Sequence, residues 1–228
     1  MAGRTHGKTY GAERGLNRFE GFSDAVFAIA LTLLIVEIKV PGSPGGPQGY
    51  SDLARAMAEQ WREHLALVMC YVVIGAYWLQ HHYSGRIYAK SDHWLSAINL
   101  VFLLAIVVVP YPIRVWCFHV ATRFEPAASV TLVAGLALTA CTWMGKWFYG
   151  MSSRRLMDER LASDFLRQMT RRYGIATLIQ IAAIPIAIAA PRFGVAIALV
   201  CVAFFLLPQP KPRYEPGEEP STDEKVRD

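Results

Sequence analysis

Residues 18–38 read RFEGFSDAVFAIALTLLIVEI, a mostly apolar run that begins with one arginine and an FSD tripeptide. As an α-helix, residues 22–38 would be about 25 Å long, which is just enough to cross the hydrocarbon core of a bilayer. The run nevertheless contains Asp24 and Glu37, and a charged side chain at membrane depth costs about 2.5 kcal/mol or more. We therefore expect a membrane-spanning helix whose polar side faces protein or water.

The apolar side chains of this helix gather on one face. At about 100° per residue, a narrow stripe lies within about 60° of Ile29, whereas Asp24 lies about 140° away. The members of this apolar stripe carry a single hydroxyl among them: Phe22, Ala25, Ile29, Thr32, Leu33 and Val36. The stripe could face only lipid or neighbouring helices. If several copies met at an axis, they would line a narrow hydrophobic passage.

The composition indicates an integral membrane protein. Of the 228 residues, 54% are hydrophobic and only 18% are charged, and the apolar residues cluster in long runs. Soluble domains have about 25% charged residues on average. The net charge of +5 does not indicate a nucleic-acid partner, because the basic residues lie between the apolar runs, where membrane proteins carry them.

The cysteines are predicted to be packing residues rather than members of a disulfide or a metal site. Cys70, Cys117, Cys141 and Cys201 lie in or at the end of different apolar runs, and no two of them form a CxxC pair. This distribution is typical of small apolar packing residues. We therefore expect no disulfide, no metal site and no cofactor.

Six apolar runs predict an all-α membrane protein with six transmembrane helices. The runs are residues 22–38, 65–80, 94–109, 126–147, 173–190 and 193–207. Pro110 and Pro112 should close the third helix, and Pro126 suits the first turn of the fourth. Residues 1–16 are predicted to be an N-terminal tail, residues 17–207 the transmembrane domain, and the Pro- and Glu-rich residues 208–228 a disordered C-terminal tail.

The basic residues predict the orientation. Six crossings put both termini on one side, and Lys and Arg are most frequent near the N-terminus, around Arg86 and Lys90, and in residues 146–172. Segments rich in Lys and Arg remain in the cytoplasm. Both termini and the FSD tripeptide are therefore expected on the cytoplasmic side, where residues 146–172 would contact anionic membrane lipids.

Several motifs resemble those of one channel family. The pattern Arg18-x-x-x-Phe22-Ser23-Asp24, followed by AVFAIALTLLI, resembles the signature of the endosomal and lysosomal potassium channel family, the transmembrane protein 175 family, and its bacterial relatives. Weaker matches follow later in the chain: Trp78-x-x-His81, Asn99-Leu100 and Pro110-Tyr111. The resemblance covers roughly residues 14–207.

This resemblance implies a homotetramer whose pore is lined by the first helix of each subunit. Ile29 matches the family's hydrophobic constriction, with Thr32, Leu33 and Val36 as further pore-lining residues. The implied function is a potassium-selective leak channel with modest selectivity over sodium and without a TVGYG filter; whether protons also pass is left open. The absence of a second FSD repeat favours a bacterial form in the plasma membrane.

Polar residues near the FSD motif predict a structural network at the cytoplasmic ends of the first three helices. Its candidate members are Arg18, Phe22, Ser23, Asp24, His81 and Asn99. Simpler roles exist: Ser23 and Asp24 could cap a helix start, and His81 could be interfacial. Asn99 is harder to explain alone, because an amide in hydrocarbon requires hydrogen-bond partners. Thr32 could either bond to the carbonyl of Ala28 or offer oxygen to a cation.

Two other functions are compatible with these residues. A proton- or ion-coupled transporter would use Asp24 and His81 as a titrating relay. A membrane enzyme would need a constellation such as His81 and His82 with Asp92 and His93, but no HExxH or comparable spacing is present. We therefore expect that the chain is not an enzyme.

Overall fold

The computed structural model describes residues 10–49 and 51–219, and in them the regular structure is almost entirely helical. The short 3-10 helices are Leu34–Glu37 and Arg154–Leu156. The α-helices are α1 (Tyr10–Leu33), α2 (Leu53–Glu59), α3 (Trp61–Ser84), α4 (His93–Val108), α5 (Pro110–His119), α6 (Glu125–Ser152), α7 (Ser163–Ala189) and α8 (Pro191–Phe204). The all-helical fold expected from the sequence is confirmed.

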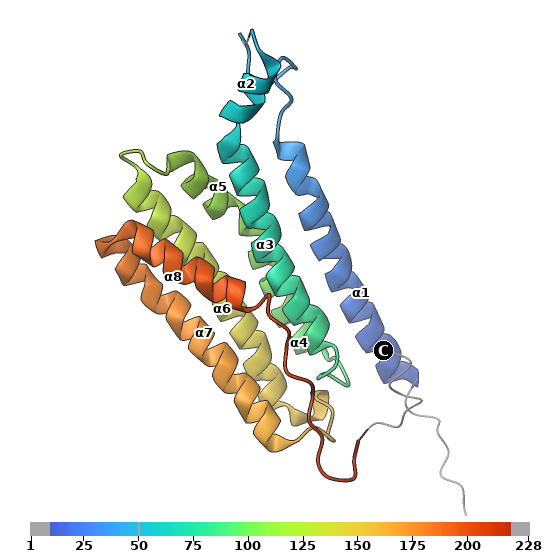
Figure 1. Cartoon of the computed structure of the whole chain (residues 1–228). Helices are drawn as coiled ribbons and strands as arrows, with labels where there is room; N and C mark the ends of the chain where they lie inside the picture. Colours follow the sequence, from blue (N-terminus) through green and yellow to red (C-terminus); the bar gives the residue numbers. More distant parts are fainter. Residues whose placement is uncertain (1–9, 50, 220–228) are drawn as a thin grey trace, which may run out of the picture.

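Five helical segments are long and apolar enough to cross a membrane. They are Leu16–Glu37, Trp61–Ser84, His93–His119, Glu125–Ser152 and Ser163–Ala189. The sixth predicted span corresponds to α8, whose 14 residues form a helix only about 20 Å long, shorter than the roughly 30 Å hydrocarbon core. In Figure 1, α8 ends partway along the bundle and the chain continues as an extended segment.

The prolines after α4 do not end the helical path, which differs from the prediction. Pro110 starts α5 directly after Val109, and the apolar helical segment continues to His119. Proline is tolerated in a first helical turn, where its missing N–H would have no intrahelical partner. The same rule holds at Pro126, which lies in the first turn of α6 as expected.

Both predicted tails contain structure within the described residues. α1 begins at Tyr10, inside the range predicted as a tail. Up to Glu219, the predicted disordered tail follows an extended path, and Tyr214 pairs with Leu161 in an isolated bridge. The Tyr83 hydroxyl also donates to the carbonyl of Pro210 at 2.6 Å. These backbone contacts, which composition does not reveal, hold residues 208–219 against the ends of the helices.

The core forms around α6, which packs against α4, α5, α7 and α8. Aromatic rings fill its centre: the Trp143 ring lies 5.2 Å from that of Phe102 and 5.7 Å from that of Tyr173, both edge-on. By contrast, α1 lies at one side of the bundle against α3 and α4 (Figure 1). The first helix is thus the least enclosed of the long helices.

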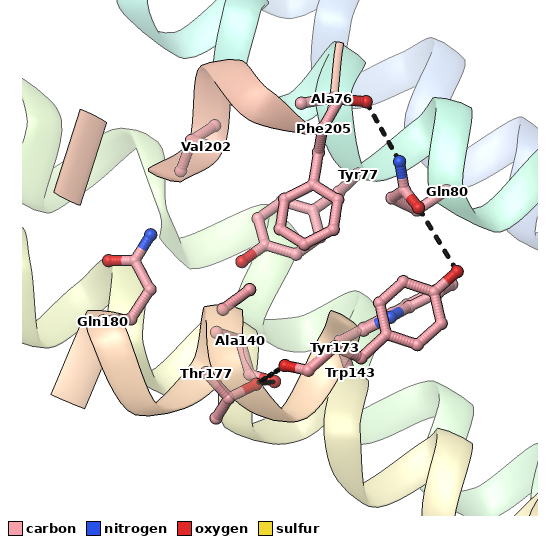
Figure 2. A pocket seen from close by; sticks show the side chains of 11 residues that line it. Ala76, Tyr77, Gln80, Ala140, Trp143, Tyr173, Thr177, Gln180, Val202 and Phe205 are labelled. Carbon is pink, nitrogen blue, oxygen red and sulfur yellow. Dashed lines mark hydrogen bonds between the residues drawn. The ribbon is translucent and has the colours of Figure 1, made fainter. Parts of the chain in front are cut away.

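A small cavity lies between α3, α6, α7 and α8, and Figure 2 shows the side chains around it. Gln80 bridges two of these helices to α3, because its Nε2 donates to the carbonyl of Phe205 at 3.0 Å and its Oε1 accepts from the Tyr173 hydroxyl at 3.3 Å. The cavity volume of about 20 Å³ suits about one water molecule and is far below that of a ligand pocket. It therefore belongs to the packing of the bundle.

Close packing of α7 against α8 depends on Gly194. A Cβ atom at this position would lie 2.5 Å from both Cα and N of Ala187. Gly194→Ala should therefore lower the free energy of unfolding by about 1–3 kcal/mol, measured by thermal unfolding in detergent. Gly145→Ala is the matched control, because no atom lies within 4 Å of the added Cβ. Equal melting temperatures for the two variants would contradict this account.

Candidate functional site

The apolar stripe of α1 lies on the outside of the single chain. Ile29, Leu33 and Val36 are 58%, 57% and 60% exposed, and Phe22 is 53% exposed. In the most apolar window of this span only 17% of residues are buried, compared with 56% for the α6 span. A soluble protein would bury such a face. In a membrane protein it must contact lipid, other subunits or a passage between subunits.

Thr32 is the polar group on this exposed face. Its Oγ1 donates to the carbonyl of Ala28 at 2.8 Å and also lies 3.2 Å from the carbonyl oxygen of Ile29. The backbone bond uses the hydroxyl hydrogen and leaves oxygen lone pairs free to accept. The two roles considered for Thr32 are therefore compatible with each other.

At its C-terminal end α1 continues as a tighter helix, and the apolar stripe remains on the same face. The chain changes from α-helix to a 3-10 helix at Leu34–Glu37. Side chains three residues apart eclipse each other in a 3-10 helix. Val36 consequently remains on the same face as Leu33.

On the opposite face, Ser23 and Asp24 join α1 to two different helices. Buried Ser23 donates to the carbonyl of Phe19 at 3.0 Å and accepts from Nδ2 of Asn99, on α4, at 2.9 Å. Asp24 accepts from the indole Nε1 of Trp78, on α3, at 3.1 Å. The two adjacent residues thus attach α1 to both of its neighbours, which restricts rotation about the helix axis.

His81 has a partner that the sequence reasoning did not identify. Its Nδ1 lies 3.0 Å from Nζ of Lys146, on α6. An ammonium group can only donate, so with Lys146 charged the His81 ring is neutral and Nδ1 accepts. The Phe27 ring packs at 5.7 Å from the ring of His81. His81 therefore links α3 to α6 and touches the inner face of α1.

Lys146 is buried, which corrects its assignment to the basic cytoplasmic segment. Only 1% of the residue is exposed, and its Nζ lies 5.0 Å from the Trp143 ring, 5.5 Å from the Phe19 ring and 5.6 Å from the Phe102 ring. Aromatic faces stabilise a cation, and the effect grows when water is excluded. The sequence contained a signal for this buried lysine. Lys146 lies before the end of the fourth apolar run, where a cation needs a partner.

The predicted network is thus divided into separate contacts. Ser23 meets Asn99, Asp24 meets Trp78, and His81 meets Lys146. Arg18 is exposed, and no hydrogen bond or ion pair in the described part of the chain joins it to the other candidates. His81 Nε2 and Asn99 Oδ1 are buried without a described partner. Within one chain, Arg18 and Phe22 remain outside the network.

The residues considered for an enzyme have structural contacts. Asp92 caps α4 by accepting from the backbone N–H of Leu95 at 2.8 Å, and it accepts from the Tyr149 hydroxyl at 2.9 Å. Among residues 10–49 and 51–219, no group of three or more His, Cys, Asp or Glu side chains could hold a metal ion. His81 is directed to Lys146 rather than to Asp92.

Comparison with known proteins gives a consistent assignment. Residues 18–110 match the family model described as "Endosomal/lysosomal potassium channel TMEM175". A potassium channel of Streptomyces collinus is 32% identical over 162 residues, which cover 71% of this chain and 77% of that protein. A chicken protein named as the endosomal/lysosomal proton channel TMEM175 is 32% identical over 97 residues, covering 41% of this chain and 19% of that protein.

A solved structure has the same fold. The crystal structure of a lysosomal potassium-selective channel TMEM175 homologue from Chamaesiphon minutus aligns with a TM-score of 0.69 at 23% identity. The alignment covers 84% of this chain and 96% of that chain. Together with the family match, which contains the FSD motif, and the extent of the Streptomyces relative, this shows that the chain belongs to the endosomal/lysosomal potassium channel TMEM175 family.

Proposed function

We propose that this protein is a potassium-selective leak channel in which the first helices of four identical chains surround the pore. The observation that carries this proposal is the exposed apolar stripe on α1, the least buried of the five long segments. One such helix cannot enclose a passage, so further copies are required. The names of the potassium channels to which the chain is similar support potassium as the permeating ion.

Ile29 would form the constriction of this pore. A ring of isoleucine side chains excludes water when narrow, so conduction would require widening or a transient wet state. The sequence has no TVGYG stretch, so selectivity would depend on the cost of dehydration and on the Thr32 oxygen. Potassium loses its water more readily than sodium, and modest selectivity follows. Leu33 and Val36 would line the pore beyond Thr32.

The polar contacts behind α1 would set its rotation and so the direction of the stripe. The bonds from Asn99 to Ser23 and from Trp78 to Asp24 support this role, because they attach one helix at adjacent positions. Arg18 and Phe22 would complete the network at the contacts between subunits.

Asp24→Ala should lower the stability of the tetramer or shift gating, since the indole N–H of Trp78 would lose its acceptor. A hydrogen bond to a charged group contributes about 1.5–3 kcal/mol. The measurement is the tetramer fraction in detergent together with the open probability in bilayers. Asp24→Asn retains an acceptor oxygen and is the control. Unchanged stability and gating in Asp24→Ala would remove this role.

We also propose the cellular arrangement. The protein would lie in the bacterial plasma membrane with both termini cytoplasmic, supported by the bacterial relatives and by the concentration of arginine near the start of α7. Residues 17–207 would form the channel domain, with α8 as the helical part of a sixth crossing that the segment after it completes. Membership of a channel family confirms that the chain is not an enzyme.

The direct test is recording from purified protein in planar bilayers with opposed potassium and sodium gradients. Discrete openings with a reversal potential shifted towards that of potassium are expected, together with a particle mass about four times 25.4 kDa. A pH gradient in the same system measures proton permeation, which the name of the chicken relative suggests. Saturable, pH-dependent uptake into liposomes without openings would instead favour a coupled transporter that uses Asp24 and His81.

A further inference from the structure

A long groove lies between α7 and α8 on the side of the chain away from α1. Its volume is about 1200 Å³, and residues of α7, α8 and the segment after α8 line it. The groove follows α8 from Ala196 to Phe204. In Figure 1, α8 ends partway along the bundle while α7 continues to the end. A helix of about 20 Å cannot cover the whole of a membrane-spanning neighbour. The space beside α7 is therefore open to whatever surrounds the protein.

One end of the groove is strongly basic. Arg167 and Arg171 lie on the same face of α7, because they are four residues apart, and no described ion pair or hydrogen bond engages either guanidinium. Arg213 reaches the same end from the segment after α8, donating to Gln168 at 2.6 Å and to Asp164 at 3.3 Å. Among the described residues that line this groove, Asp164 is the only acidic one, so positive charge dominates there.

Arg172 lies where the basic end meets the apolar part. Its guanidinium carbon lies 4.7 Å from the centre of the Phe204 ring. The Nε atom of Arg172 is buried, and no described residue accepts a hydrogen bond from it. A planar, stacked guanidinium with an unused donor suits an oxygen-bearing anion such as a phosphate.

The other end of the groove is apolar and exposed. Ile175 and Ile179 of α7 are 47% and 40% exposed, and Val200 and Phe204 of α8 are 70% and 48% exposed. These side chains follow the basic end along the same groove. A free inorganic anion would use the arginines but would leave this apolar surface uncovered. An amphipathic anion complements both ends.

We propose that this groove binds an anionic phospholipid, with its phosphate among Arg167, Arg171, Arg172 and Arg213 and an acyl chain along α8. Each basic residue near a membrane surface favours anionic lipid. The acyl chain fills the volume that the short α8 leaves beside α7. This site is separate from the exposed stripe of α1, so its existence does not depend on the position of the pore.

The test is native mass spectrometry of the purified full-length protein in neutral detergent, with added phosphatidylglycerol or phosphatidylcholine. Wild type should retain phosphatidylglycerol in preference to phosphatidylcholine, and R167Q/R171Q should weaken phosphatidylglycerol binding roughly tenfold. R86Q/R154Q is the matched control, because it removes two exposed arginines that do not line the groove. Equal loss in both double variants would mean unspecific charge attraction and would overturn the site.

A second variant tests the apolar part of the groove. Ala196 is exposed and lines the groove, so A196W should obstruct it while all four arginines remain. Phosphatidylglycerol binding should then fall at least as much as in R167Q/R171Q. Unchanged binding in A196W would restrict the interaction to the headgroup and overturn the proposed lipid groove.

Two controls distinguish other occupants. Inorganic phosphate should not displace phosphatidylglycerol; displacement at millimolar concentrations would identify a free phosphate site instead. The oligomeric state of R167Q/R171Q and A196W should equal that of wild type. A smaller assembly would identify the groove as a contact between copies and would also overturn the proposal.

Discussion

Ile29→Ala is expected to raise the potassium current through single channels by roughly tenfold and to weaken selectivity over sodium. Ile29 is 58% exposed in the single chain, so the substitution does not open a cavity in the core. In the proposed tetramer it would widen the narrowest ring and make it easier to wet. A barrier lower by about 1.4 kcal/mol corresponds to about a tenfold rate increase.

Ile188→Ala is the matched control for this experiment. Ile188 is also exposed, at 66%, but it lies on α7, away from the apolar stripe of α1 and outside the proposed pore. Its substitution removes the same atoms and should leave current and selectivity unchanged. If both variants changed conduction equally, a general effect on the protein would explain the result and Ile29 would not be the constriction.

Lys146→Ala is expected to lower the free energy of unfolding by about 2–5 kcal/mol, since it leaves a cavity among aromatic rings. It also removes the only described partner of His81 Nδ1. Lys146→Met keeps most of the volume and should be more stable than Lys146→Ala by about 2–5 kcal/mol. Thermal unfolding in detergent, followed by tryptophan fluorescence, measures these differences.

The double variant His81→Phe with Lys146→Met separates packing from polarity. Replacing both members of a buried polar pair by apolar groups of similar size is often neutral, or stabilising by about 1–4 kcal/mol. We expect this variant to be at least as stable as wild type, with altered gating because α1 loses the contact between the Lys146 ammonium and the Phe19 ring. A double variant as unstable as Lys146→Ala would show that the pair itself stabilises the fold.

Much of this protein could be predicted from local sequence. The apolar runs predicted a helical membrane protein, because the periodicity and length of a span are properties of neighbouring residues. The FSD motif indicated the family that the comparisons show. The bond from Thr32 to the carbonyl of Ala28 was also one of two predicted roles, since a helix brings these positions together whatever surrounds it.

Contacts between distant segments could be predicted only in part. Asn99 within an apolar run required a partner, and in the structure its Nδ2 donates to the Ser23 hydroxyl. Trp78, the partner of Asp24, was visible only as part of a family motif. Arg18 was grouped with these residues because it opens the family signature, yet it lies on the exposed side of α1 in the single chain.

The sequence by itself determined that the chain lies in a membrane, that it is helical and that α1 has two different faces. Hydropathy and helical period are local quantities, so neighbouring residues are enough to determine them. Only the tertiary structure decided that Lys146 is buried beside His81, that α8 is short beside α7, and that residues 208–219 pack on the helix ends. The physical reason is that burial depends on which helices meet. A lysine at the end of an apolar run can extend to water or turn inward. Which of these occurs depends on the side chains that other helices place around it.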